Sequence, residues 1–180
     1  MNRKDFEAGP LAEAHWRADG DRWTLTFART LRHPPERVWA ALTDPDQLAE
    51  WAPYKASGDL GAPGDVTLTM IDGDIAEDLA ATVRRADPPT LLEYSWGDDL
   101  LRWELAAVAG GTRLTLHHTV AERDMLPNVA AGWHICLVVA ERLLDGEPVG
   151  PIRGREAMDY GWQELHDRYA AELGVPTPGA

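Results

Sequence analysis

The longest stretch of apolar residues with a helical period lies between Leu126 and Asp145. At 100° per residue its large apolar side chains fall on one broad side, whereas Asn128, His134 and Glu141 fall on the other. Pro127 suits a first helical turn, and the glycine and proline that follow Asp145 end the helix. The pattern predicts one long helix whose apolar face is wider than that of an ordinary surface helix.

The chain before this helix alternates between apolar and polar positions, which is typical of half-buried strands. Glycine- and proline-containing turns separate the expected strands, which are Val66–Ile71, Ile75–Arg85, Leu91–Trp96, Leu100–Val108 and Thr112–Val120. Because the intervening loops are too short for parallel crossovers, the strands should form an antiparallel meander. A sheet with one apolar and one polar face needs a cover, and the long helix is the available one.

The remaining elements are shorter. Leu11–Arg17 could form an edge strand, and Asp19-Gly20 predicts a turn into a strand at Trp23–Phe27. A helix is expected over Pro35–Thr43. A second short helix should follow with Asp44 as its N-cap.

A last helix is predicted over about Met158–Leu173, because Met158, Trp162, Leu165, Tyr169 and Leu173 share one face. It must pack on another surface. One alternative is the polar side of the long helix, where Ile135 and Val138 otherwise lack a partner. The other is a second subunit, which would make the protein a homodimer.

The formal net charge of −13 disfavours nucleic acid as a partner, because phosphate binding needs clustered basic residues. It equally disfavours an anionic membrane surface. The chain has no apolar run long enough to span a bilayer and no apolar segment at its start that would indicate secretion. A single cysteine, Cys136, excludes an internal disulfide. We therefore expect a soluble cytoplasmic protein.

The order of these elements resembles the helix-grip fold of the START-like (SRPBCC) superfamily. Three local motifs are similar to those of the HSP-90 ATPase activator-like family: HPPERVWAALTDPDQLAEWAP, DPPTLLEYSWGDDLLRWELAAVAGGTRLTLHHTV and AAGWHICLVVAERLLDGEPV. The resemblance implies an α+β domain in which a curved antiparallel sheet of about six to seven strands wraps around the long helix. It covers residues 20–148 of a single domain spanning 1–180, with extensions at residues 1–20 and 149–180.

The resemblance also implies a cavity between sheet and helix. Strand alternation and the helical wheel place on its walls Met70, Leu79, Tyr94, Trp96, Trp103, Leu116, His118, Trp133 and Leu137. These residues form the predicted site for an apolar or aromatic small molecule. The alternative is that they fill the core, where burying a large apolar side chain contributes roughly 2 kcal/mol.

No cofactor, metal or catalytic motif is recognisable. His117 and His118 are adjacent on a strand and so point to opposite faces, where they cannot share one metal ion. His134 is expected to pair locally, for example with Glu141. Acidic pairs such as Asp98 and Asp99 lie in turns and are expected at a solvated rim. Cys136 should pack in the core rather than act as a nucleophile.

Three functions are compatible with this pattern. The first is binding of an apolar or aromatic small molecule between sheet and helix. The second is a chaperone-ATPase-activator-like interaction protein, which the family resemblance suggests by analogy. The third is a cavity enzyme of the cyclase, dehydratase or hydrolase type, for which His118 and Tyr94 are the candidate acid–base groups.

Overall fold

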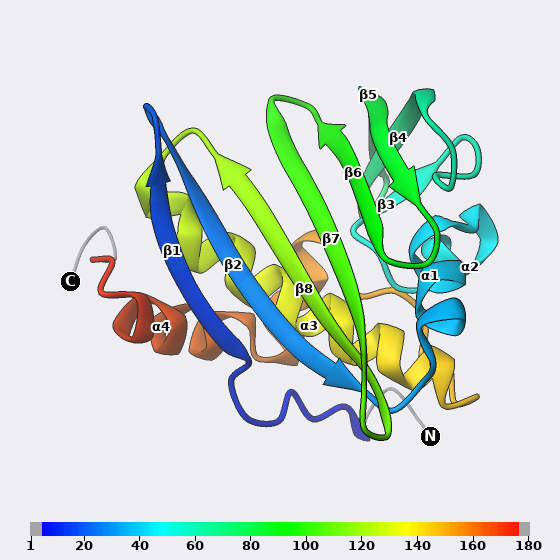
Figure 1. Cartoon of the computed structure of the whole chain (residues 1–180). Coiled ribbons are helices and arrows are strands. Elements are labelled where there is room, and N and C mark those ends of the chain that lie inside the picture. The colour runs from blue at the N-terminus through cyan, green and yellow to red at the C-terminus, as the bar shows by residue number, and fades with distance from the viewer. Residues whose placement is uncertain (1–4, 177–180) are drawn as a thin grey trace.

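The computed structural model describes residues 5–176 as an open antiparallel sheet wrapped around one long helix (Figure 1). The strands are β1 (Glu13–Asp19), β2 (Arg22–Leu31), β3 (Tyr54–Ala56), β4 (Gly64–Asp72), β5 (Ile75–Asp87), β6 (Leu91–Trp96), β7 (Asp99–Val108) and β8 (Gly111–Val120). The helices are α1 (Pro35–Thr43), α2 (Pro45–Ala49), α3 (Leu126–Leu144) and α4 (Trp162–Leu173), with 3-10 turns η2 (Arg123–Met125) and η3 (Gly154–Tyr160).

The sheet order is β1-β2-β8-β7-β6-β5-β4-β3, and every neighbouring pair is antiparallel. The predicted meander and helix-grip architecture are therefore confirmed. The described residues contain eight strands rather than six to seven, because the Glu13–Asp19 edge strand and the short Tyr54–Ala56 strand both pair. A register shift between Val83 and Arg85 marks an irregularity in β5, a type of feature that bends a strand and increases its twist.

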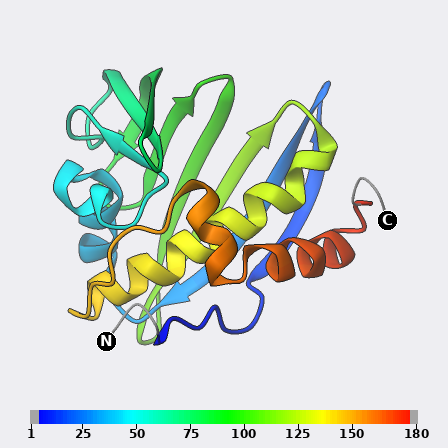
Figure 2. The ribbon, with the colours of Figure 1, turned by 180° about the vertical axis from the view of Figure 1, so that it is seen from behind.

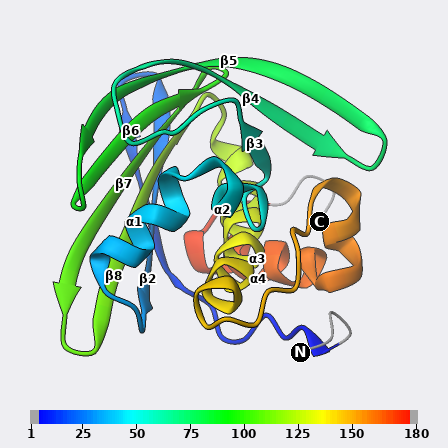
Figure 3. The ribbon, with the colours of Figure 1, turned by 90° about the vertical axis from the view of Figure 1, so that its right-hand side faces the viewer.

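The long helix α3 crosses the concave face of the sheet (Figure 2), and seen end-on the sheet curls around it (Figure 3). It begins and ends within one residue of the predicted bounds. The strand residues expected to face α3 follow the predicted alternation of apolar and polar positions. Leu101, Trp103 and Leu116, for example, are fully buried. One continuous core thus joins the helix to both halves of the sheet.

Two short helices connect β2 to β3 at one end of the sheet, and their start signals act as predicted. The Asp44 carboxylate accepts hydrogen bonds from the backbone N–H groups of Asp46 and Gln47, at 2.9 and 3.1 Å. Pro45 occupies the first helical position. This N-cap fixes the direction in which the chain enters α2, and so the place of the segment that follows it.

The C-terminal helix α4 packs on α3 and against β1 of the same chain. Its apolar face is therefore buried within the chain, as in the first of the two alternatives. Leu165, Tyr169 and Leu173 are buried there. The helix is shorter than expected, because Gly161 adopts a left-handed conformation (φ 86°) that separates it from η3. As a result Met158 does not share the buried face and is 51% exposed.

His134, expected to pair with Glu141, instead joins three segments of the chain. Its Nε2–H donates to the Ala8 carbonyl oxygen at 2.6 Å, since that oxygen can only accept. Its Nδ1 therefore accepts from the Tyr169 hydroxyl at 2.7 Å, and that hydroxyl accepts from the backbone N–H of Ala12 at 2.9 Å. His134 has these partners because the N-terminal segment and α4 bury this side of α3.

Burial lowers the pKa of His134, so the folded protein holds this imidazole neutral at pH values where the unfolded chain takes up a proton. The free energy of unfolding should therefore fall as the pH drops below about 6.5, the ordinary value for histidine. In His134→Gln this contribution disappears. Urea denaturation at pH 7.5 and pH 5.5 measures it, and equal losses in both proteins would contradict the prediction.

Candidate functional site

The space directly between the sheet and α3 is filled by aromatic rings. The rings of Trp103 and Trp133 meet edge-to-face with centroids 5.2 Å apart, and the ring of Trp51 also meets that of Trp103 edge-to-face, with centroids 6.2 Å apart. Trp51, Tyr94 and Trp103 are at most 1% exposed. Edge-to-face pairs of this kind contribute beyond the area they bury. The centre of the helix grip is thus a packed core.

The polar ends of these rings bind one another. The hydroxyl groups of Tyr54 and Tyr94 share a short hydrogen bond, and Trp103 Nε1 donates to the Tyr94 oxygen at 3.3 Å. Burial raises the pKa of Tyr94 to about 12, so this phenol stays protonated at neutral pH. Paired in this way, the buried hydroxyl groups need no ligand or water as partner.

His118 is held in the same manner. The Trp133 indole N–H donates to His118 Nδ1 at 2.9 Å, so the ring proton must lie on Nε2. Nε2 then donates to the Asp99 carboxylate at 2.7 Å, and Arg22 lies 3.6 Å from that carboxylate. Asp99, expected at a solvated rim, therefore orients a buried histidine. Both ring nitrogens of His118 are used within the fold.

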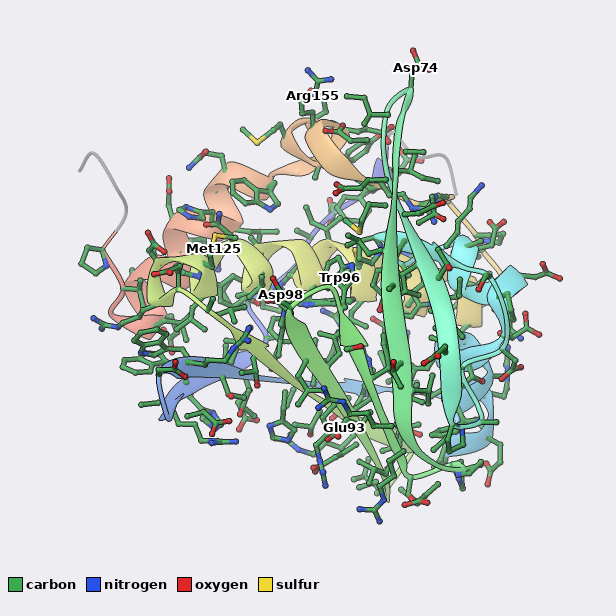
Figure 4. The ribbon with its side chains drawn as sticks, turned by 90° about the horizontal axis from the view of Figure 1, so that it is seen from above. Asp74, Glu93, Trp96, Asp98, Met125 and Arg155 are labelled. Carbon is green, nitrogen blue, oxygen red and sulfur yellow. The ribbon has the colours of Figure 1, made fainter. Side chains whose placement is uncertain are left out.

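A cavity of about 490 Å³ lies beside the packed core rather than inside it. We name it the side cavity. Its walls come from α3, from the ends of β4 and β6, and from the chain that returns after α3, residues 145–161, here called the return segment. The lining residues are Pro53, Met70, Trp96, Met125, Asn128, Val129, Gly132, Trp133, Ile135, Cys136, Ile152, Arg153, Gly154, Ala157 and Trp162. In Figure 4, Trp96 lies at the end of β6 close to α3, and Met125 lies at the start of α3.

The α3 wall of the side cavity follows the helical period through Asn128, Gly132 and Cys136. Gly132 is the informative member. A glycine inside a helix costs about 1 kcal/mol relative to alanine, and it is usually explained by close packing. Here, apart from the two chain neighbours and the backbone of the same helix, no heavy atom lies within 4 Å of the place where a Cβ would stand. This glycine leaves space open instead of admitting a neighbour.

The return segment forms part of the wall of the side cavity and is held in place at two points. Arg153 donates through Nε to the Ala52 carbonyl and through Nη2 to the Ala49 carbonyl, each at 2.8 Å, which joins it to the end of α2. The Asp72 carboxylate accepts from the backbone N–H of Arg155 at 3.0 Å, which joins it to the β4–β5 turn. A side chain at Gly154 would overlap Asp72, so only glycine permits this approach.

The structure separates the predicted site residues into two groups. Met70, Trp96 and Trp133 line the side cavity, where the Trp96 indole N–H donates to the Met70 sulfur at 3.2 Å. A second group lies outside the cavity lining, comprising Tyr94, Trp103, Leu116, His118 and Leu137, which are buried in the core, and Leu79, which is half-buried. Neither candidate acid–base group, His118 or Tyr94, therefore reaches the cavity.

Most of the remaining wall was not predicted from the sequence. Ile152, Arg153 and Trp162 belong to the return segment or the start of α4, whose position depends on tertiary contacts. Ile135 faces this cavity. Val138 lies instead along a small polar hollow of about 250 Å³ with Ala8 and Gly9. Gly132 was an available signal, because a glycine is unfavourable inside a helix and stands here next to Trp133 in a mostly apolar stretch.

Within residues 5–176, no group of three His, Cys, Asp or Glu side chains could hold a metal ion. None of the helices in that range is long and apolar enough to cross a membrane. The chemistry of the site is therefore that of an apolar wall with two polar residues, Asn128 and Arg153.

The curved sheet, the helix across its concave face and the lateral cavity define a helix-grip protein of the START-like class. Within that class, the sequence profile of the Activator of Hsp90 ATPase homolog 1-like protein family matches residues 32–145, which is more than half of the chain. The protein belongs to this family. Among curated protein sequences, none matches the chain.

Solved structures share the fold. CalU16 from Micromonospora echinospora is 23% identical with a TM-score of 0.65, and the match covers 89% of this chain and 95% of that one. EF2215 from Enterococcus faecalis, titled a conserved protein of unknown function, is 18% identical with a TM-score of 0.67, covering 92% and 93%. The AHSA1-like protein from Aeromonas hydrophila is 23% identical with a TM-score of 0.57, covering 68% and 92%.

Gly132→Ala should stabilise the protein by about 1 kcal/mol, because the methyl group enters open space and alanine favours the helix. For a chain of this length we expect thermal unfolding to shift upward by roughly 2–4 °C. Gly111→Ala is the matched control: its Cβ would overlap the Leu31 carbonyl oxygen, so it should lower the midpoint. A lower midpoint for Gly132→Ala would show that the space is filled.

Cys136 should react slowly with a thiol reagent such as Ellman's reagent. Burial raises the pKa of this thiol to about 12, although the nearby Arg153 acts in the opposite direction. At pH 8 the thiolate fraction in the folded protein is then roughly a thousandth of that in the unfolded chain. The rate of colour development with and without 6 M urea measures this difference, and similar rates would contradict it.

Proposed function

We propose that the protein binds an apolar or aromatic small molecule in the side cavity. The observation that carries the proposal is the open space above Gly132, at the centre of a wall formed by three indole rings and aliphatic side chains. A volume of about 490 Å³ falls in the range of about 300–1,000 Å³ that is typical of small-molecule sites.

The contrast between the packed core and the open side cavity supports this proposal. The core between sheet and helix is packed, with its buried phenol, indole and imidazole groups hydrogen-bonded to one another. The side cavity differs, because its wall has few polar groups and its three tryptophans offer broad ring surfaces. Transfer of an apolar ligand from water to such a wall is favourable by roughly 25 cal/mol per Å² of apolar surface buried.

Membership of the family supports a fold of the ligand-binding type, and the ligand of this protein follows from its own cavity. The candidate acid–base groups of the enzyme hypothesis, His118 and Tyr94, are buried outside the lining. The side cavity instead offers ring faces and the sulfur-containing side chains of Met70, Met125 and Cys136. Retention of a ligand therefore suits this geometry better than its chemical conversion.

Gly132→Leu tests the proposal by extending a side chain from α3 into the cavity. We expect it to weaken binding of neutral one- and two-ring aromatic compounds at least about tenfold, because the ligand and the leucine compete for one volume. Binding is measured by isothermal titration calorimetry, and native mass spectrometry of protein from its host reports a retained molecule.

The matched control is Ala171→Leu, which adds the same side chain to the exposed face of α4, away from the cavity lining. It should bind like the wild type. The proposal fails if Gly132→Leu binds as tightly as the wild type. It also fails if no compound binds and no retained mass is seen.

A further inference from the structure

The side cavity contains one charged side chain among its lining residues, that of Arg153. Its position is fixed, because two of its N–H groups donate to the Ala49 and Ala52 carbonyl oxygens at the end of α2. A guanidinium has five N–H donors in a rigid plane, so three remain. Among residues 5–176 these three have no hydrogen-bond acceptor.

Among residues 5–176, no Asp or Glu forms an ion pair with the charged group of Arg153, whereas the neighbouring Arg155 pairs with Asp72. Burial lowers the pKa of Arg153, and attraction to Glu50 offsets this effect only in part. A guanidinium stays charged at neutral pH. A half-buried guanidinium beside an apolar wall is therefore expected to attract an anion, which would compensate its charge.

We propose that the ligand of the side cavity is an aromatic or apolar carboxylic acid whose carboxylate binds Arg153. This inference rests on the proposed function, because it assigns the polar end of the same ligand. The planar guanidinium fork matches a carboxylate in shape and charge. The side-chain N–H group of Asn128 is a second donor on the wall, since its one contact within the described chain is a long one of 3.9 Å to the Met125 sulfur.

The overall charge of the protein makes the inference specific. With a formal net charge of −13, the long-range field repels anions, so a preference for an acid must come from a local cation. The competing explanation is that Arg153 only fastens the return segment to α2. The two explanations differ in whether the cavity distinguishes an acid from a neutral compound of the same shape.

The experiment compares 2-naphthoate with 2-naphthamide, which share a ring system and differ in charge. Isothermal titration calorimetry at pH 7.5 gives both dissociation constants for the wild type, Arg153→Met and Arg155→Met. The last is the matched control: it removes the same charge from the same segment, its side chain is 82% exposed, and the bond from its backbone to Asp72 is retained. Figure 4 shows Arg155 pointing away from the body of the molecule.

We expect the wild type and Arg155→Met to bind the acid about tenfold more tightly than the amide, as a charge-assisted hydrogen bond allows. Arg153→Met should bind the two compounds equally. Because the amide reports the cavity itself, unchanged amide binding in Arg153→Met shows that the cavity is intact. In the wild type, the Arg153 Nε–H resonance should shift with the acid and not with the amide, a readout that needs no variant.

Equal binding of acid and amide by the wild type would overturn this inference and leave the proposed function standing. If Arg153→Met still binds the acid more tightly than the amide, the inference is overturned as well, since another group would then bind the carboxylate. If neither compound binds the wild type while other neutral aromatics do, the acid is the wrong class. If no aromatic compound binds at all, the proposed function fails together with this inference.

Discussion

The burial of α3 on all sides is the constraint on which the rest of the structure depends. The helix is apolar around most of its circumference, and from Ala130 to Ala140 all its residues except Gly132 are buried. A curved sheet can cover only one side of such a helix. The other sides are covered by α4, by the N-terminal segment through His134 and Tyr169, and by the return segment. The two extensions of the chain therefore complete the burial of the helix.

Polar atoms inside this core decide where free space can exist. A buried indole or phenol without a partner is costly, and the aromatic residues between sheet and helix avoid that cost by binding each other. The Trp133–His118–Asp99 series and the Tyr54–Tyr94–Trp103 cluster make the centre rigid and full. The side cavity remains where the return segment passes over α3, since Arg153 holds that segment to the end of α2, the backbone of Arg155 holds it to Asp72, and it does not collapse onto Gly132.

The architecture could be predicted from the sequence because it rests on local pattern. Alternation fixed the inner faces of the strands, the Asp44 cap fixed the start of α2, and the helical period fixed α3. The site could be predicted only in part. The inward direction of Trp96 followed from the alternation along its strand, and that of Trp133 from the helical period. These patterns do not distinguish a ring that lines a cavity from one that fills the core, and Trp103 fills the core. Arg153 lies in the return segment, where no periodic pattern constrains the chain, and Trp162 was predicted on the apolar face of the last helix but not on the wall of a cavity. His134 was misjudged because its partners are far away in sequence.

The position of the return segment outside the matched family region has a consequence for how binding could diversify. Residues 32–145 supply strands β3 to β8, helix α3 and the floor of the side cavity, whereas Ile152, Arg153, Ala157 and Trp162 supply its roof. Floor and roof are separate stretches of chain, so a change of roof need not disturb the packed aromatic centre that stabilises the fold. In this protein the packed aromatic centre and the roof of the side cavity are encoded in different parts of the sequence, so exchanging one short stretch after the long helix would change the roof and leave the aromatic residues of the centre in place.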